Sequence, residues 1–430
     1  MTGGFDDWGG AEFVLAADRL DMPDVIEAAD PGDVLRQVAS SAAQVRTALR
    51  SCLETDLSAL TPDARPRAVV VAGMGASGLA GEILGAVTGL SSPVQIVISR
   101  AERLAGWVGA ADAVIAVSPD GSTAETLALA AEAARRGCRL AAVGAKDSPL
   151  QHIAEQARAP FVPVIPAGPP GSMLPRSMLW ALAVPLLVIA ERLGVARIAP
   201  EAYELAASRL EEVSHQCRPA SESFVNPGKS QALDLVGTLP VVWGTSVLSG
   251  VAARRFASQL TENAKYPAIT GLLPEAAHDQ ISAFDGPFAP PAGPALDPAD
   301  TADADRDAAL AAGPSLEPDT GTGLADLPSW DLDYDDTQPG RVRGFTPLRL
   351  VMIADPGEDQ RVGAQRAAIT ELAAQRGIGL SELAMDGEHP LVRLAGVIQL
   401  ADYASVYLAV ASGIDPGQAV AITDLSARIE

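Results

Sequence analysis

Residues 68–78 read AVVVAGMGASG, a short apolar run of β-branched residues that ends in two closely spaced glycines. Such a run predicts a buried strand, and Gly73 and Gly75 predict a tight turn into a helix over residues 78–87. The same pattern returns at residues 113–118, where AVIAVS precedes PDGSTAETLALA. Because apolar strands alternate with helical stretches, the sequence predicts a parallel sheet covered by helices on both faces.

This alternation continues along most of the chain. Further strands are expected at residues 93–99, 140–145, 161–165, 240–244, 348–354 and 378–384. Helices are expected at residues 122–136, 149–157, 173–193, 200–217, 247–262, 359–376 and 390–412, with a short helix near 274–283. The sequence therefore predicts an α/β protein with two doubly wound parallel-sheet domains, at residues 61–195 and 196–430, after a helical segment at residues 1–60. In that segment, Asp30 is the expected helix cap.

Residues 286–346 interrupt the second domain and carry almost no periodic apolar pattern. Between residues 297 and 336 there are 12 acidic residues and one basic residue, Arg306. Low hydrophobicity with high net charge predicts a solvated surface insertion. The alternative is an acidic lid or docking arm that Trp330 and Tyr334 hold against a surface.

The overall charge excludes some classes of partner. The 430 residues carry 31 Lys+Arg and 54 Asp+Glu, a net charge of −23, of which residues 297–336 supply 1 − 12 = −11. Nucleic acids and anionic membranes require clustered basic residues, so neither is an expected partner. The 13-residue apolar run at residues 178–190 is shorter than the roughly 20 residues that span a bilayer, which predicts a buried helix. Three separate cysteines and the absence of a signal peptide favour a cytoplasmic protein.

Two of the predicted strand-to-helix loops could bind an anion. Residues 73–78 place glycines at the start of a helix, where the backbone can approach a ligand and the helix terminus attracts negative charge. Residues 118–126, SPDGSTAET, place hydroxyl groups at the start of another helix. A packing turn and ordinary helix capping are the alternatives for the two loops. Their occurrence together in one sheet favours a phosphate site.

The segments GMGASGLAGEIL, SPDGSTAETLALA, LPRSMLWAL, QLTENAKYPAI, LPEAAHDQI and SGIDP carry a resemblance to a known family. In this order, they resemble the bifunctional phosphoglucose/phosphomannose isomerases, which are sugar isomerase (SIS) proteins with two flavodoxin-like domains. The resemblance runs from about residue 20 to the C-terminus, apart from the insertion. TENAKYP and LPEAAHD are its most specific parts.

The resemblance implies an aldose–ketose isomerase. Such an enzyme needs a carboxylate to move a proton between C1 and C2, a cation near the enediolate oxygens, and an acid/base to open the sugar ring. By similarity, Glu262 is the base, Arg176 lies by the C1 and C2 oxygens, and His278 opens the ring from the neighbouring subunit of a homodimer. The implied substrate-binding residues are Gly75, Ala76, Ser77, Asp120, Ser122 and Thr123. A sugar phosphate or sugar derivative is the implied ligand, and no metal or other cofactor is expected.

The chain departs from the family at several of these positions. The second loop of the family reads close to SGNT, whereas this chain has Asp120 and Ser122 at the flanking positions, and Ala76 replaces a usual glycine. Ser426 stands where the family has a catalytic lysine. Asp120 matters most, because a carboxylate about 5 Å from a phosphate costs roughly 3 kcal/mol per charge, or about two orders of magnitude in affinity.

Several explanations of Asp120 are open from the sequence. Its carboxylate points away, is protonated, pairs with a cation such as Arg176, or binds a hydroxyl group of an unphosphorylated sugar. Two functions follow. The first is an isomerase that interconverts glucose 6-phosphate or mannose 6-phosphate with fructose 6-phosphate. The second is a catalytically weakened protein that binds a carbohydrate derivative in a regulatory role. Lys265 and Glu275 are expected to support the loop and not to do chemistry, and no motif surrounds His152, His215 or His389.

Overall fold

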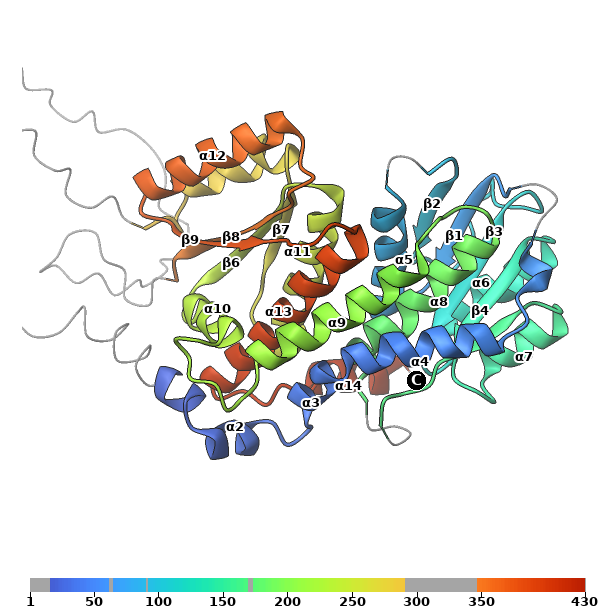
Figure 1. Cartoon of the computed structure of the whole chain (residues 1–430), viewed down its shortest axis with the longest axis horizontal. Helices are drawn as coiled ribbons and strands as arrows, with labels where there is room; N and C mark the ends of the chain where they lie inside the picture. The colour runs from blue at the N-terminus through green and yellow to red at the C-terminus, as the bar shows by residue number, and fades with distance from the viewer. Residues whose placement is uncertain (1–15, 62–64, 90–91, 169–172, 291–345, 430) are drawn as a thin grey trace, which may run out of the picture.

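Two parallel β-sheets with a layer of helices between them make up the protein (Figure 1). The computed structural model describes residues 16–61, 65–89, 92–168, 173–290 and 346–429. The first sheet has the strand order β2-β1-β3-β4-β5, and all its pairings are parallel. Its strands are β1 (Ala68–Ala72), β2 (Gln95–Ser99), β3 (Ala113–Ser118), β4 (Arg139–Gly144) and β5 (Phe161–Pro163). This is the strand order of the flavodoxin-like doubly wound fold.

The second sheet repeats the arrangement with four strands. Its order is β7-β6-β8-β9, again with parallel pairings throughout. The strands are β6 (Leu239–Gly244), β7 (Ile269–Leu272), β8 (Leu348–Ala354) and β9 (Gly379–Ala384). In each sheet the first strand along the chain therefore lies between the second and the third. The prediction of two doubly wound α/β sheets is confirmed.

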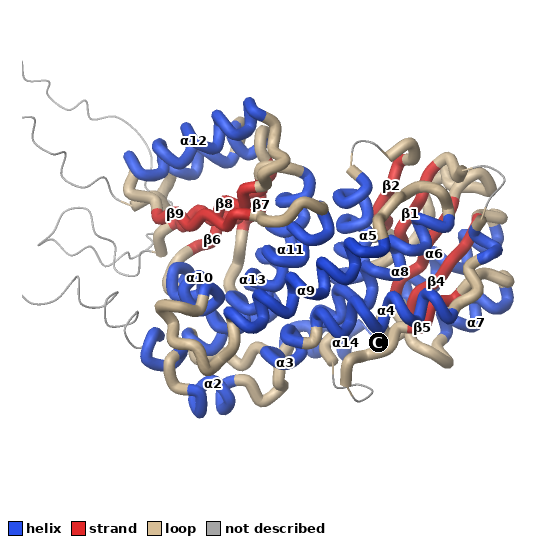
Figure 2. The backbone as a smooth tube through the Cα atoms, in the orientation of Figure 1, coloured by secondary structure: helices blue, strands red, loops and turns tan. Residues whose placement is uncertain are grey.

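Helices fill the space between the sheets and cover their outer faces (Figure 2). The central helices are α4 (Ser41–Glu54), α5 (Gly75–Thr88), α8 (Leu179–Arg192), α9 (Pro200–Gln216), α10 (Pro227–Leu235), α11 (Val247–Ala264) and α13 (Pro390–Ala411). On the outer face of the first sheet lie α6 (Ala124–Arg135) and α7 (Pro149–Gln156). On that of the second lie α12 (Gln360–Gln375), η3 (Glu275–Ala277) and η4 (Gln280–Asp285).

The central strands β1 and β3 are buried on both faces, and their successive side chains point to opposite sides of the sheet. In β1, Val69 and Val71 belong to the central core, whereas Val70 and Ala72 belong to the outer core beneath α6 and α7. All five residues of β1 are buried. This explains why the strands of the sequence are continuous apolar runs and not alternating ones.

The N-terminal segment is helical, as predicted, and packs on the central layer. It contains α2 (Pro23–Ala29), α3 (Val34–Ala39) and α4. The carboxylate of Asp30 accepts hydrogen bonds from the backbone N–H groups of Val34 and Leu35, each at 2.8 Å. These are among the N–H groups that the start of a helix leaves without a partner, so the Asp30 side chain supplies the expected capping contact although the N-cap residue of α3 is Asp33.

The sequence analysis does not predict three of the observed elements: α10, β7 and α14 (Val420–Ile429). Strand β7 is four residues long and half-exposed, so its sequence, ITGL, lacks a buried apolar run. Helix α10 begins at Pro227, and the side chain of Asn226 accepts hydrogen bonds from Gly228 and Lys229. That cap and Pro227 at the first helical position are both start signals, and they outweigh the glycine of the first turn.

Some predictions fall outside the described residues or are untested by them. The proposed insertion at residues 286–346 lies almost wholly in the undescribed stretch at 291–345, and the side chain of Ser426 is also not described. The boundary near residue 195 stays a prediction, because helices from both sides of it share the central core. The helix expected from the apolar run at 178–190 is α8, and the described residues bury all of its positions except the last two.

Helix α13 is long and apolar enough to cross a membrane by length and composition, within the part of the chain that is described. However, 94% of its apolar window is buried inside the protein. Its hydrophobicity is therefore accounted for by the central layer of the fold, where it contacts α9, α10 and α11.

Both sheets use a glycine at the end of their first strand to bring the next helix close. A Cβ atom on Gly73 would lie 2.7 Å from Cβ of Ser77, and one on Gly244 would lie 2.4 Å from the backbone nitrogen of Gly250. Only a residue without a side chain permits this approach. The helices α5 and α11 are thereby placed against the ends of β1 and β6.

We predict that Gly244→Ala lowers the free energy of unfolding by about 2 kcal/mol or more, because the new methyl group meets the backbone of α11. Gly85→Ala is the matched control, since a Cβ on Gly85 in α5 has no neighbour within 4 Å. It should leave stability unchanged or raise it by up to about 1 kcal/mol. Urea unfolding curves of the two variants measure the difference, and equal effects would contradict the packing argument.

Candidate active site

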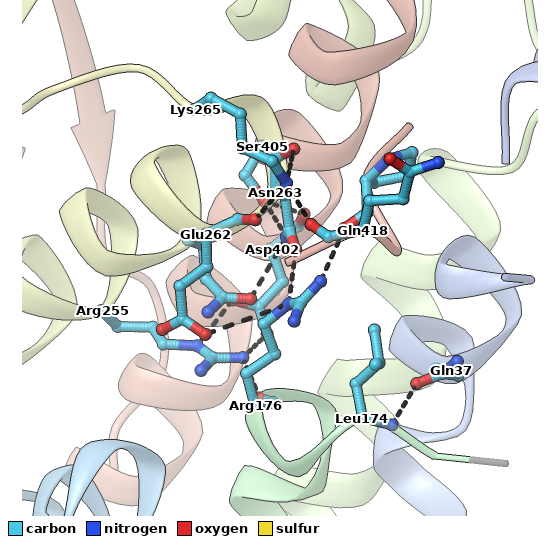
Figure 3. A network of polar contacts seen from close by, with 12 residues as sticks. Gln37, Leu174, Arg176, Arg255, Glu262, Asn263, Lys265, Asp402, Ser405 and Gln418 are labelled. Carbon is cyan, nitrogen blue, oxygen red and sulfur yellow. Dashed lines mark hydrogen bonds and ion pairs between the residues drawn. The ribbon is translucent and has the colours of Figure 1, made fainter. Parts of the chain in front are cut away.

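Arg176 and Glu262 lie side by side where the chain brings η2 (Pro175–Met178) to the end of α11 (Figure 3). The Nε atom of Arg176 is 4.0 Å from Oε2 of Glu262 and donates a hydrogen bond to Oδ1 of Asn263 at 2.8 Å. The Glu262 side chain is 34% exposed, whereas that of Arg176 is 8% exposed. The carboxylate is thus reachable by a small molecule, with a buried cation directly behind it.

The guanidinium of Arg176 is held by several groups. Its Nη2 atom donates to the backbone carbonyl of Pro416 at 2.6 Å. Burial lowers the pKa of Arg176, and the charge of Glu262 opposes that shift. Because a guanidinium is not deprotonated in proteins, the group remains a cation. This fixed positive charge can stabilise an oxyanion that develops beside Glu262.

A buried ion pair anchors the backbone of Arg176. Arg255 in α11 and Asp402 in α13 form two hydrogen bonds of 2.8 Å each. The Nη2 atom of Arg255 also donates to the backbone carbonyl of Arg176 at 2.8 Å. Both charged side chains are almost fully buried. The pair therefore connects two central helices to η2 and sets the position of Arg176.

Lys265 supports the site, as the sequence suggests. It ends α11 in the left-handed conformation, with φ of 62°. Its Nζ atom donates to the carbonyls of Glu262 and Gln418, each at 2.7 Å, and to that of Asn263 at 3.2 Å. Burial and then the charge of Arg176 lower the pKa of Lys265. Lys265 thus fastens the segment after α13 to the end of α11 and adds positive charge near Glu262.

The structure does not bring His278 to Glu262 within one chain. His278 follows η3 and is exposed. Its neighbours Glu275 and Gln280 line a groove of about 560 Å³ together with Gly250, near the start of α11. Glu262 lies 12 residues further along the same helix, which corresponds to about 18 Å at 1.5 Å per residue. The remaining histidines lie elsewhere: His152 in α7, His215 in α9 and His389 as the cap of α13.

The first glycine loop leads from β1 into α5. Gly75 has φ of 49° and is exposed, whereas Ser77 is 2% exposed. Ala76 is half-buried and packs against the central core. Among these three predicted substrate-binding residues, only Gly75 offers its backbone openly to solvent.

In the second loop, between β3 and α6, the carboxylate of Asp120 accepts hydrogen bonds from neighbouring residues of the same loop. Oδ1 of Asp120 accepts hydrogen bonds from Oγ of Ser118 at 2.7 Å and from the backbone N–H of Ser122 at 3.1 Å. Oδ2 accepts one from Oγ of Ser122 at 2.5 Å. The hydroxyl oxygens of Ser118 and Thr123 are 2.9 Å apart. The hydroxyl groups expected to bind a ligand are therefore grouped around Asp120.

The carboxylate of Asp120 is ionised in this setting. Partial burial works to raise the pKa of Asp120, but hydrogen bonds from Ser122 and Ser118 outweigh it and hold the pKa below its usual value. Within the described residues, Arg176 is paired with Glu262 and not with Asp120. Two of the explanations above, protonation and pairing with Arg176, therefore do not apply.

Metal binding finds no support in the described part of the chain. No group of three or more His, Cys, Asp or Glu side chains there is arranged to hold an ion. The expectation that no cofactor is needed stays a prediction.

In comparisons with known proteins, the chain is similar to phosphoglucose isomerases. Residues 224–429 match the family described as bacterial phospho-glucose isomerase C-terminal SIS domain. A bifunctional phosphoglucose/phosphomannose isomerase of Caldicellulosiruptor bescii is 26% identical over 51% of this chain and 63% of its own length. One of Thermoplasma acidophilum is 23% identical over 84% of this chain and 89% of its own length.

The chain is similar to phosphoglucose/phosphomannose isomerases, and its C-terminal half matches the SIS domain of that family.

The part of the chain that matches this family profile contains Glu262 and His278, while Arg176 and the two N-terminal loops precede it. The chain spans 63% of the length of the relative from Caldicellulosiruptor bescii. A D-glucosamine-6-phosphate 4-epimerase of Sulfolobus acidocaldarius is also similar, at 27% identity over 49% of this chain and 62% of its own length.

Solved structures support the SIS fold. A hypothetical protein from Thermus thermophilus aligns with a TM-score of 0.60 at 14% identity, over 97% of this chain and 94% of its own. The C-terminal domain of glucosamine-fructose-6-phosphate aminotransferase from Francisella tularensis aligns with a TM-score of 0.54 at 13% identity, over 90% of this chain and 98% of its own. At these identities the likeness concerns the fold alone.

Sequence reasoning missed three residues of the site: Asn263, Arg255 and Asp402. Asp402 had a detectable signal, because it is a lone carboxylate in the apolar stretch LAGVIQLADYASVYLAV. A charge on such a helix needs a buried partner. Nothing in the sequence indicates that Arg255 is that partner, since the two residues are 147 positions apart.

Proposed function

We propose that the protein is an aldose–ketose isomerase of sugar phosphates. The observation that carries this proposal is the exposed Glu262 carboxylate, 4.0 Å from the buried Arg176 guanidinium. A carboxylate in this position can take the proton from C2 of an open-chain sugar and return it to C1. The guanidinium stabilises the enediolate oxygens while the proton is transferred. Lys265, which donates to the backbone carbonyl of Glu262, adds positive charge near it.

Hexose 6-phosphates are the first substrates to test. The similar curated proteins are bifunctional phosphoglucose/phosphomannose isomerases. By analogy, the reaction would interconvert glucose 6-phosphate or mannose 6-phosphate with fructose 6-phosphate. The loops at Gly75–Ser77 and Asp120–Thr123 would hold the phosphate at the starts of α5 and α6. We place the protein in the cytoplasm, without a metal or other cofactor.

We further propose that His278 acts in the active site of a second copy. His278 is exposed and lies near the opposite end of α11 from Glu262, so one chain cannot unite the two groups. A twofold symmetric homodimer would place the His278 of each subunit against the Glu262 of its partner. There it would act as the acid/base that opens the sugar ring.

A second candidate function rests on Asp120. Its ionised carboxylate already accepts the hydrogen bonds that a phosphate would need, and about 5 Å from a phosphate it costs roughly 3 kcal/mol per charge. Ser426 also replaces the lysine of the family. A catalytically weakened protein that binds a carbohydrate derivative in a regulatory role accommodates both changes. It predicts that a sugar ligand raises Tm without being converted.

The first test is Glu262→Gln, which keeps the shape of the side chain but removes the base. We expect kcat for interconversion of glucose 6-phosphate and fructose 6-phosphate to fall roughly 10²–10⁴-fold in a coupled assay. Glu201→Gln, an exposed carboxylate at the start of α9, is the control and should retain activity. Unchanged turnover in Glu262→Gln would refute its role as base. No turnover in the natural protein would favour the regulatory function.

The shared site is tested by mixing two inactive variants, Glu262→Gln and His278→Ala. A heterodimer of the two contains one site with both natural groups, so subunit exchange should restore roughly a quarter of the natural activity. Each variant alone should stay inactive after the same treatment. If the mixture remains inactive although mass spectrometry detects heterodimers, the intersubunit site is wrong.

The role of Asp120 is tested by the affinity for a phosphorylated sugar. Asp120→Ser removes the charge, so we expect its affinity for glucose 6-phosphate to rise on the order of 100-fold in isothermal titration calorimetry. Glu125→Gln removes an exposed charge from the first turn of the same helix and should change affinity less than about threefold, since exposed charges are well screened. Equal affinities in Asp120→Ser and the natural protein would show that the carboxylate does not limit phosphate binding.

A further inference from the structure

Asn263 binds one of the two charged groups of the site and is the neighbour in sequence of the other. Unrestrained arginine and carboxylate side chains close to bidentate hydrogen bonds of about 2.8 Å. Here the Nε atom of Arg176 is 4.0 Å from Glu262, because it donates to Oδ1 of Asn263 at 2.8 Å instead. Asn263 is 1% exposed and directly follows Glu262 in α11.

The orientation of the Asn263 amide is determined by its other contacts. Its Nδ2 atom donates to Oγ of Ser405 at 2.9 Å and to Oε1 of Gln259 at 3.3 Å. The hydroxyl of Ser405 donates to the carbonyl of Asp402 at 2.7 Å, so it can only accept from Asn263. A flipped amide would turn its NH₂ group toward the N–H of Arg176. The oxygen of Asn263 therefore faces Arg176.

Both the guanidinium and the backbone carbonyl of Arg176 are therefore held by residues that contact α13. Its guanidinium donates to Asn263, which in turn donates to Ser405 in α13. Its backbone carbonyl accepts from Arg255, which is paired with Asp402 in α13. The carbonyl of Pro416 takes a further N–H at 2.6 Å. Glu262 is the least constrained member of this network, with its side chain 34% exposed.

We propose that Asn263 is a positioning residue which keeps Arg176 from closing onto Glu262. This inference rests on the proposed function, in which Glu262 is a base and Arg176 stabilises the enediolate. A tight ion pair would favour the charged carboxylate too strongly and make it a poor base, and it would occupy the N–H groups that the enediolate needs. The separation of 4.0 Å keeps both groups available.

Substitutions of opposite electrostatic effect test the proposal through the pH–rate profile. In Asn263→Ala, Arg176 can approach Glu262, so the acid limb of kcat should move about one unit to lower pH and kcat should fall roughly tenfold, with little change in KM. In Asn263→Asp, the oxygen acceptor is kept and a negative charge is added near Glu262. Its acid limb should move to higher pH.

Asn226→Ala is the matched control, because Asn226 is a fully buried asparagine that caps α10 away from the site. It should lose stability and keep the natural pH–rate profile. If both Asn263 variants also keep that profile, Asn263 is merely structural and the proposal is wrong. If Asn263→Ala does not fold, the proposal is judged by whether the acid limb of kcat moves to higher pH in Asn263→Asp.

A crystal structure of a ligand-free Asn263 variant tests the proposal without turnover. Failure of the positioning role of Asn263 can therefore be distinguished from failure of the proposed isomerase function. We expect the distance between the guanidinium of Arg176 and the carboxylate of Glu262 to shorten in Asn263→Ala to about 2.8 Å and to remain near 4 Å in Asn263→Asp. A shortened pair in a protein without isomerase activity would support the restraint and refute the proposed reaction. An unchanged distance in Asn263→Ala would overturn the restraint.

Discussion

The buried ion pair between Arg255 and Asp402 is the interaction on which the site depends. Taking both charges out of water is costly, and apolar residues of the same size would often be as stable. The pair supplies orientation as well: it joins α11 to α13 and presents one N–H of Arg255 to the carbonyl of Arg176. Because these helices lie between the two sheets, the pair also links the two halves of the fold at the site.

Each sheet carries an aspartate at its carboxyl edge, and the two carboxylates have different partners. In the second sheet, Asp355 follows β8 and accepts a hydrogen bond from Ser246 at 2.6 Å, and Arg393 lies 3.0 Å from it. In the first sheet, Asp120 follows β3 and is surrounded by hydroxyl groups. The charge of Asp355 is compensated by arginine, whereas hydroxyl groups cannot neutralise Asp120. Negative charge therefore persists at the one edge where a phosphate would bind, and the choice between the two functions depends on it.

Much of the candidate site could be named from the sequence, because short motifs carry its chemistry. Glu262 and Arg176 come from TENAKYP and LPRSMLW, and the structure brings them within 4.0 Å. Asn263 stands in the same motif, yet its role depends on Ser405, 142 residues further on. The sequence likewise placed Asp120 in a ligand loop but left its partners open. Hydrogen bonds to Ser118 and Ser122 decide its ionisation, and they depend on side-chain directions in the turn.

The sequence by itself determined the two parallel sheets, because β-branched runs followed by glycine turns and amphipathic helices have one stable arrangement as doubly wound layers. It also named the residues that are candidates for the chemistry. Only the tertiary structure decided that His278 and Glu262 lie near opposite ends of α11, and that Asn263 binds the guanidinium of Arg176 beside Glu262. The reason is physical: local propensity depends on neighbours along the chain, whereas the separation of buried charges depends on how α11, α13 and η2 pack together in the folded protein.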